Sequence, residues 1–146
     1  MITSIDIKTK NGRFNDDIIG RVKIRRGQAR FRKGLLEVFN YKCAISECSI
    51  EGLLEAAHIV PHSTSINYEL SNGILMRSDI HTLFDLNLIK IKSNGEVQMS
   101  EQLMNDAYYS NLLSERKIRM PQISDDALNK FKEALEFRYQ QYGKIL

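Results

Sequence analysis

Three histidines and one asparagine are the residues whose types and spacing suit hydrolytic chemistry. The chain has only three histidines, and two of them, His58 and His62, lie in the segment EAAHIVPHS. The third, His81, follows in SNGILMRSDIHTLFD, nine positions after Asn72. A histidine titrates near neutral pH, so it can accept a proton from water or bind a divalent cation. Either these residues are scattered polar positions, or the fold brings them to one site.

The local pattern predicts which elements carry these residues. LLEAAHIV is predicted as a strand and GILM as a second strand, separated by a polar stretch rich in turn formers. Ser78 is predicted to cap a helix that runs through DIHTLFDL. The order strand, loop, strand, helix brings His58, Asn72 and His81 toward one end of a hairpin.

This order of elements and several short sequence segments resemble the HNH, or ββα-metal, endonuclease motif. AHIVP, NGILMRSDIH and HTLFDLNLI are similar to the HNH domains of restriction-type endonucleases. The preceding RRGQARFRKGLLEVFNYKCAIS is similar to the segment that such proteins carry before the site, and the same spacing occurs in RNA-guided CRISPR nucleases. The likeness covers about residues 25 to 92. It implies an α+β fold with a ββα-metal core, flanked by an N-terminal helix, a β-hairpin and a C-terminal helix.

The resemblance also implies a role for each residue. His58 would be the general base that takes the proton of the attacking water. Asn72 would order the loop and hold the imidazole or its neighbouring backbone in place. His81 would bind the metal, with Asp85, one helical turn later, as a second ligand and His58 as a further candidate. The plain structural alternatives are a core histidine at position 58, a turn residue at 72 and a helix-flanking ion pair at 85.

The sequence departs from the family pattern at Ala57. Many HNH domains place an acid or a second histidine there as a metal ligand. The second protein ligand is then expected from Asp85, His62 or Glu55, or the metal keeps more water. Mixed imidazole, carboxylate and water ligation suits Mg²⁺, Mn²⁺ or Ni²⁺ better than a closed Zn²⁺ cage.

Two cysteines, Cys43 and Cys48, precede the first predicted strand. A structural zinc site normally needs four ligands, and this chain has no second cysteine pair. They are predicted to be ordinary thiols, and the alternative is a zinc site with His62 as a further ligand.

Positive charge is concentrated in residues 21–33, RVKIRRGQARFRK. This segment holds seven of the 21 basic residues and no acid, which leaves 14 basic against 18 acidic residues, a net of about −4, in the rest of the chain. Such a segment suits a polyphosphate backbone, and the alternative is a solvated helix face. The candidate DNA-contacting residues are Arg25, Arg26, Arg30, Arg32, Lys33 and Arg77.

The remaining elements are expected to complete a single compact domain. RVKI and CAIS are predicted as short strands, and Gly27 to Asn40 as an amphipathic helix. Asn94-Gly95 predicts a hairpin, and Ser124 is predicted to cap a C-terminal helix that buries one apolar stripe. The expected divisions are an N-terminal extension (1–24), the HNH nuclease core (25–92) and a hairpin with a helical extension (93–146).

The leading hypothesis is a metal-dependent DNA endonuclease of the restriction or anti-phage type. No apolar run reaches the length of a signal peptide or a membrane span, so the expected location is the cytoplasm, with no membrane partner. The alternatives are a catalytically decayed HNH-like module that binds nucleic acid, and a protein-interaction domain that uses the C-terminal helix. A chain this short is expected to be an isolated nuclease domain, a fragment or a subunit, and a homodimer would allow both DNA strands to be cut.

Overall fold

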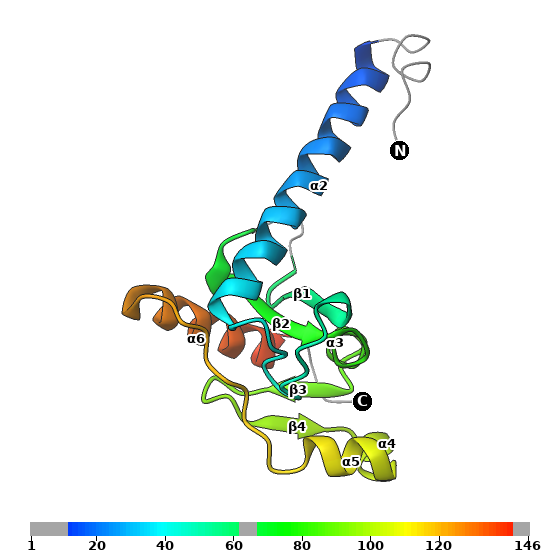
Figure 1. The fold of residues 1–146 in the computed structure, drawn as a ribbon, viewed down its shortest axis with the longest axis vertical. Helices are drawn as coiled ribbons and strands as arrows, with labels where there is room; N and C mark the ends of the chain where they lie inside the picture. Colours follow the sequence, from blue (N-terminus) through cyan, green and yellow to red (C-terminus); the bar gives the residue numbers. More distant parts are fainter. Residues whose placement is uncertain (1–11, 62–66, 142–146) are drawn as a thin grey trace.

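The computed structural model describes residues 12–61 and 67–141, in which helices and two small sheets share one core (Figure 1). Within these residues the chain forms five α-helices and two antiparallel sheets of two strands, so the α+β class is confirmed. None of the described helices has both the length and the apolar character needed to cross a bilayer. The elements are α2 (Gly12–Val38), η1 (Glu51–Leu53), β1 (Leu54–His58), η2 (Leu70–Asn72), β2 (Gly73–Arg77), α3 (Ser78–Asp85), β3 (Ile89–Ile91), β4 (Val97–Met99), α4 (Glu101–Met104), α5 (Ala107–Leu113) and α6 (Asp125–Gln141).

The longest element, α2, runs without a break through residues 21–24, where the sequence predicted a short strand. That prediction was wrong. Arginine and lysine are good helix formers, and a helix that is already packed can be extended at little cost in free energy. The alternation of basic and apolar residues in RVKI therefore does not make this segment a strand. The C-terminal half of α2 buries Phe31, Leu35 and Leu36 in the core, whereas its N-terminal half extends away from the rest of the described chain (Figure 1).

The strands β1 and β2 pair antiparallel, with His58 opposite Gly73, and α3 begins directly after β2. Both strands were predicted. The prediction of Ser78 as the helix cap was wrong by one residue, because Ser78 is the first helical residue and the cap is Arg77, whose backbone is still extended. The Thr82 hydroxyl donates a hydrogen bond to the Ser78 carbonyl, at 3.1 Å.

Gly73 on β2 lies directly against side chains of α2. A Cβ atom at this position would lie 2.5 Å from Phe31 Cζ and 2.6 Å from Leu35 Cδ1. The Phe31 ring therefore occupies the space where a side chain of residue 73 would lie. This position also brings the ring to His58 on the paired strand.

The second sheet is the predicted hairpin. Strands β3 and β4 pair antiparallel, and Gly95 takes a φ of +94°, which suits a residue without a Cβ atom. Lys92 N donates to the Glu96 carbonyl at 2.9 Å and closes the turn. The prediction of a hairpin at Asn94-Gly95 is confirmed.

The C-terminal helix α6 begins as the sequence predicted. The Ser124 hydroxyl accepts a hydrogen bond from Ala127 N at 3.2 Å, and the apolar stripe buries Phe131 and Leu135 in the core. The two short helices α4 and α5 were not predicted. The side chains of Ser100 and Asp106 cap them, and they are too short to show a clear apolar period.

Residues 43–46, predicted as a strand, form a turn instead. Ala44 N donates to the Leu75 carbonyl and the Ala44 carbonyl accepts from Arg119 N, both at 2.9 Å. These are single bonds to two different segments, so no ladder forms. The thiols of Cys43 and Cys48 are free, and the first is buried.

We expect Gly73→Ala to destabilise the chain by about 1–3 kcal/mol, because the new methyl group must displace Phe31 or Leu35 in a packed core. Chemical denaturation followed by circular dichroism measures the change. Gly52→Ala is the matched control, since nothing lies within 4 Å of its Cβ position. Equal stability of the two variants would contradict the close approach of α2 to β2.

Candidate functional site

Strand β1 presents different residues to its two sides, because successive side chains in a strand alternate. Glu55 contacts His81 on α3, so the side of β1 that carries Glu55 faces α3. Ala57 shares this side and is fully buried. His58, three residues after Glu55, leaves the opposite side, where it meets α2.

His81 lies between two carboxylates. Its Nδ1 is 2.7 Å from Glu55 Oε1, and its Nε2 is 3.2 Å from Asp85 Oδ2. The Asp85 contact follows from helix geometry, since residues four apart share one face. The Glu55 contact joins α3 to β1. All three side chains remain partly open to solvent, with exposed fractions of 22% for His81, 48% for Glu55 and 59% for Asp85.

The His58 ring is held by aromatic contacts. It stacks on Phe31 with 4.4 Å between ring centroids and 18° between planes, and Tyr68 lies beside it at 5.8 Å. The two rings restrict the rotation of the imidazole. The structure thus brings His81 to Glu55 and Asp85 on one side of β1, and His58 to Phe31 and Tyr68 on the other.

Asn72 fixes the chain just after His58. Its side-chain amide exchanges two hydrogen bonds with the backbone of Val60, accepting from N at 3.0 Å and donating to O at 3.1 Å. Its own carbonyl accepts a bond from Ile59 N at 2.9 Å. Asn72 is 3% exposed, so these bonds are shielded from water. Its contacts are with the backbone that follows β1.

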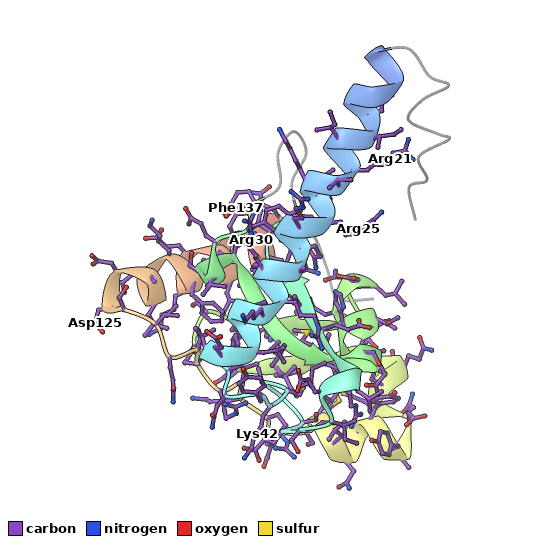
Figure 2. The ribbon with its side chains drawn as sticks, turned by 45° about the horizontal axis from the view of Figure 1, so that its top comes forward. Arg21, Arg25, Arg30, Lys42, Asp125 and Phe137 are labelled. Carbon is purple, nitrogen blue, oxygen red and sulfur yellow. The ribbon has the colours of Figure 1, made fainter. Side chains whose placement is uncertain are left out.

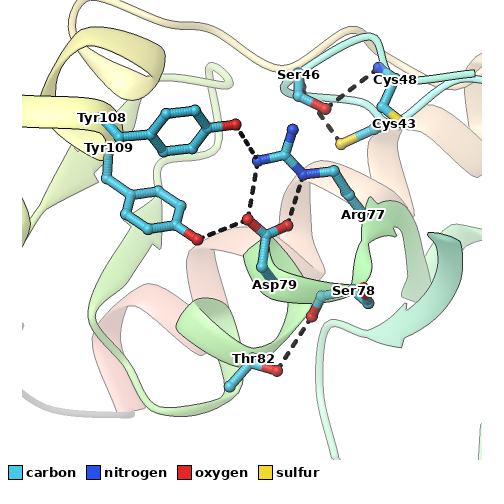
Figure 3. A network of polar contacts seen from close by, with 9 residues as sticks. All are labelled: Cys43, Ser46, Cys48, Arg77, Ser78, Asp79, Thr82, Tyr108 and Tyr109. Carbon is cyan, nitrogen blue, oxygen red and sulfur yellow. Dashed lines mark hydrogen bonds and ion pairs between the residues drawn. The ribbon is translucent and has the colours of Figure 1, made fainter.

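Arg77 and Asp79 form an ion pair at the start of α3, and two tyrosines of α5 extend it (Figure 3). Hydrogen bonds from Arg77, at 2.6 and 2.9 Å, lower the pKa of Asp79 to about 2. The Tyr109 hydroxyl donates to Asp79 at 2.7 Å, and this bond raises the pKa of Tyr109 to about 12. The same ion pair raises the pKa of Arg77, which also donates to the Tyr108 hydroxyl. Arg77 is therefore engaged in holding α3 against α5.

The basic residues of α2 divide into two groups. The Arg32 guanidinium donates to the backbone carbonyls of Leu54 and Glu51, at 3.1 and 2.9 Å, and so ties α2 to β1 and η1. The other four predicted DNA-contacting residues of this helix are exposed to solvent; they are Arg25, Arg26, Arg30 and Lys33.

The candidate metal ligands are only partly among the described residues. His62 lies outside the described residues, so neither its possible role beside Cys43 and Cys48 nor its role near His81 is tested. Among the residues that the structure does describe, no group of three or more His, Cys, Asp or Glu side chains gathers in a way that could hold a metal ion. Any cation at His81 would then take most of its ligands from water or substrate.

The sequence predicted Glu55 only as one of several possible ligands, although the two-residue repeat of the strand could have indicated its contact with His81. Glu55 lies two residues before Ala57, on the same side of the strand, and its longer side chain reaches His81. Phe31 and Tyr68 were not singled out, because their contact with His58 depends on the packing of α2.

Comparison with known families identifies this region. Residues 43–92, about a third of the chain, match the model of a family described as HNH endonuclease. These residues form an HNH-family domain. The predicted family is thereby confirmed, and it indicates endonuclease-type activity in general. No curated protein matches the chain.

The HNH domain contains all the candidate catalytic and metal-binding residues, but other parts of the chain support it. Phe31 on α2 and Tyr109 on α5 lie outside residues 43–92, as does Arg138 on α6. Arg138 donates to the carbonyls of Ile59 and Phe84, at 2.9 and 2.8 Å, and thereby links the end of β1 to α3.

We expect the stabilising effect of the Asp79 ion pair to depend on pH. The pKa of Asp79 is lower in the folded chain than its ordinary value of 3.8, so the pair stabilises the fold above about pH 4 and loses this effect as the pH falls toward 2. Asp79→Asn should therefore cost about 1 kcal/mol at pH 7, a modest value because the pair is partly exposed. The cost should disappear near pH 2.

Urea denaturation at a series of pH values measures this difference. Asp126→Asn, at an exposed carboxyl of α6, is the control and should show no such pH-dependent loss. A destabilisation by Asp79→Asn that stayed constant from pH 7 to pH 2 would contradict the assignment.

Proposed function

We propose that this chain is a divalent-metal-dependent endonuclease that hydrolyses DNA phosphodiester bonds, with β1, β2 and α3 serving as its ββα-metal unit. The observation that carries the proposal is the position of His81 between Glu55 and Asp85, within a segment that matches the HNH endonuclease family. The similarity of AHIVP and HTLFDLNLI to the HNH domains of restriction-type endonucleases favours the restriction or anti-phage type. Cutting both strands of a duplex would require two such sites, which a homodimer or a larger assembly would supply.

HNH nucleases generally use divalent metal ions. The proposed protein ligands of such an ion are His81 and Asp85, with water or substrate supplying the others. Imidazole nitrogen and carboxylate oxygen are ligands that such an ion accepts. His81 Nε2 and Asp85 Oδ2 lie 3.2 Å apart, which supports the proposal that they would hold the same ion. The ion would stabilise the charge on the phosphate and on the departing oxygen.

Glu55 completes this arrangement from the other nitrogen of the ring. By accepting a hydrogen bond from Nδ1–H, it fixes the tautomer that leaves Nε2 available as a ligand. A carboxylate that orients a metal-bound histidine is a common arrangement.

His58 is the proposed general base. A neutral imidazole can take the proton of a water molecule as its oxygen attacks phosphorus and the bond to the 3′ oxygen breaks. Phe31 and Tyr68 hold the ring in one orientation, and Asn72 fixes the backbone two residues further on. The exposed cations of α2 would contact phosphates and give affinity without sequence preference.

A catalytically decayed, nucleic-acid-binding HNH module is the second candidate. It is favoured by Ala57, which is fully buried on the side of β1 that faces α3 and cannot bind a metal. Metal binding separates the two candidates, because a decayed site would bind DNA but no divalent cation.

Cleavage is the primary test. We expect the wild-type chain to cut plasmid DNA with Mg²⁺ or Mn²⁺, and His58→Ala to cut about 10²- to 10⁴-fold more slowly, because it lacks the proton acceptor. Thermal denaturation of the variant controls for loss of the stacking contact with Phe31. Equal cleavage by both proteins, or no cleavage by the wild type with any divalent ion, rules the proposal out.

Metal binding is tested by isothermal titration with Mn²⁺. Asp85→Asn should weaken binding strongly because it removes a ligand, and Glu55→Gln should weaken it about 10- to 100-fold because it removes the group that orients His81. Glu51→Gln, at an exposed residue just before β1, is the matched control. If all three variants bind Mn²⁺ as the wild type does, the ion is held elsewhere.

A further inference from the structure

The N-terminal half of α2 forms an arm that leaves the body of the protein at Tyr68. The Tyr68 ring packs against Gly27, where a Cβ atom would lie 2.6 Å from Tyr68 Cε2, and its hydroxyl donates to the Ile24 carbonyl at 3.1 Å. Toward the N-terminus, apart from the adjacent residues of the helix itself, no atom of residues 12–61 or 67–141 lies within 4 Å of the Cβ position of Gly20. Figures 1 and 2 show this part of the helix extending away from the other elements.

The arm and the turn next to it carry an unusual charge. From residue 18 to residue 36 the chain has no acid. Six of its basic side chains are exposed, and none of them takes part in an ion pair within the described part of the chain; they are Arg21, Lys23, Arg25, Arg26, Arg30 and Lys33. A row of exposed positive side chains of this kind suits an anionic partner.

These cations form two lines along the helix. At 3.6 residues per turn, Arg21 and Arg25 lie on one side, as Figure 2 shows. Lys23, Arg26, Arg30 and Lys33 lie on another, since they are separated by three, four or seven positions. A helix about 10–12 Å wide fits the major groove of B-DNA, which presents a row of phosphates on each side. Two lines of cations match two rows of phosphates, whereas a single strand offers only one.

The position of the arm relative to His58, the proposed general base, is set by α2. Phe31, on the same helix, stacks on His58. With a rise of 1.5 Å per residue, Arg25 lies about 9 Å and Arg21 about 15 Å further along the helix axis than Phe31. Taken along the duplex axis at 3.4 Å per base pair, these distances correspond to no more than about three to four base pairs.

We propose that α2 is a duplex-binding arm that holds DNA on one side of the cleaved bond, with its outer contacts within about four base pairs of that bond. The inference rests on the proposed endonuclease function and adds its substrate class, a duplex that continues past the cut along α2. Tyr68 contacts both His58 and the base of the arm, so it fixes their relative positions.

The test compares two double variants in the full chain carrying His58→Ala, so that the DNA stays intact. We expect Arg21→Gln with Arg25→Gln to weaken binding to a 24-base-pair duplex about 10- to 50-fold at 0.1 M salt, and to lower the slope of log affinity against log salt by about 2. Lys117→Gln with Lys132→Gln, at exposed lysines outside α2, is the control and should change neither quantity. Fluorescence anisotropy measures both, and circular dichroism confirms folding.

The same double variant in the active chain tests the offset. Duplexes shortened stepwise from one end should lose cleavage when fewer than about four base pairs remain on the arm side, and the Arg21/Arg25 variant should lose this length dependence. An unchanged salt slope in a protein whose parent binds and cuts DNA overturns the arm and leaves the nuclease intact. Equal losses on single-stranded DNA, or a changed oligomeric mass in light scattering with unchanged DNA affinity, also overturn it. Absence of both binding and cleavage in the parent overturns the function itself.

Discussion

The alternation of side chains along β1 is the constraint on which the account of this site depends. In five residues the strand places Glu55 on the side of α3 and His58 on the side of α2. The proposed cation site and the proposed base are therefore built from opposite sides of one short strand. Under the proposed function a phosphodiester substrate would contact both, and so would lie across the end of the hairpin, where Asn72 fixes the chain that follows His58.

Segments far apart in the sequence keep that strand in place. On one side, the missing side chain of Gly73 admits Phe31, which carries α2 to His58. On the other, Arg138 of α6 lies over the Phe84 ring, 3.6 Å from its centroid, and binds the carbonyls of Ile59 and Phe84. The HNH domain of residues 43–92 thus depends on both flanking regions for the geometry of its candidate residues.

Local patterns predicted the elements whose structure is decided locally. The strands around His58 and residues 73–77, the hairpin at Asn94-Gly95 and the cap at Ser124 all follow from short-range signals. The strand predicted at residues 21–24 was wrong because a packed helix extended through it. The strand at 43–46 was wrong because its backbone bonds go to two separate segments.

The candidate site follows the same division. The spacing of His58, Asn72, His81 and Asp85 indicated the family without any structure. The partner of His81 across the hairpin could have been found from the two-residue repeat of β1, because Glu55 shares the side of Ala57. The contact between Tyr68 and α2 could not, since it depends on where a distant helix packs.

The central claim is that His81 and Asp85 of α3 hold a cation and that His58 acts as the general base. One measurement tests the cation site most directly. It is anomalous diffraction from crystals of the chain grown with Mn²⁺. The account predicts a manganese peak bonded to His81 Nε2 and Asp85, with Glu55 still hydrogen-bonded to Nδ1. Crystals that contain manganese elsewhere, with His81 still bridging the two carboxylates, would contradict it.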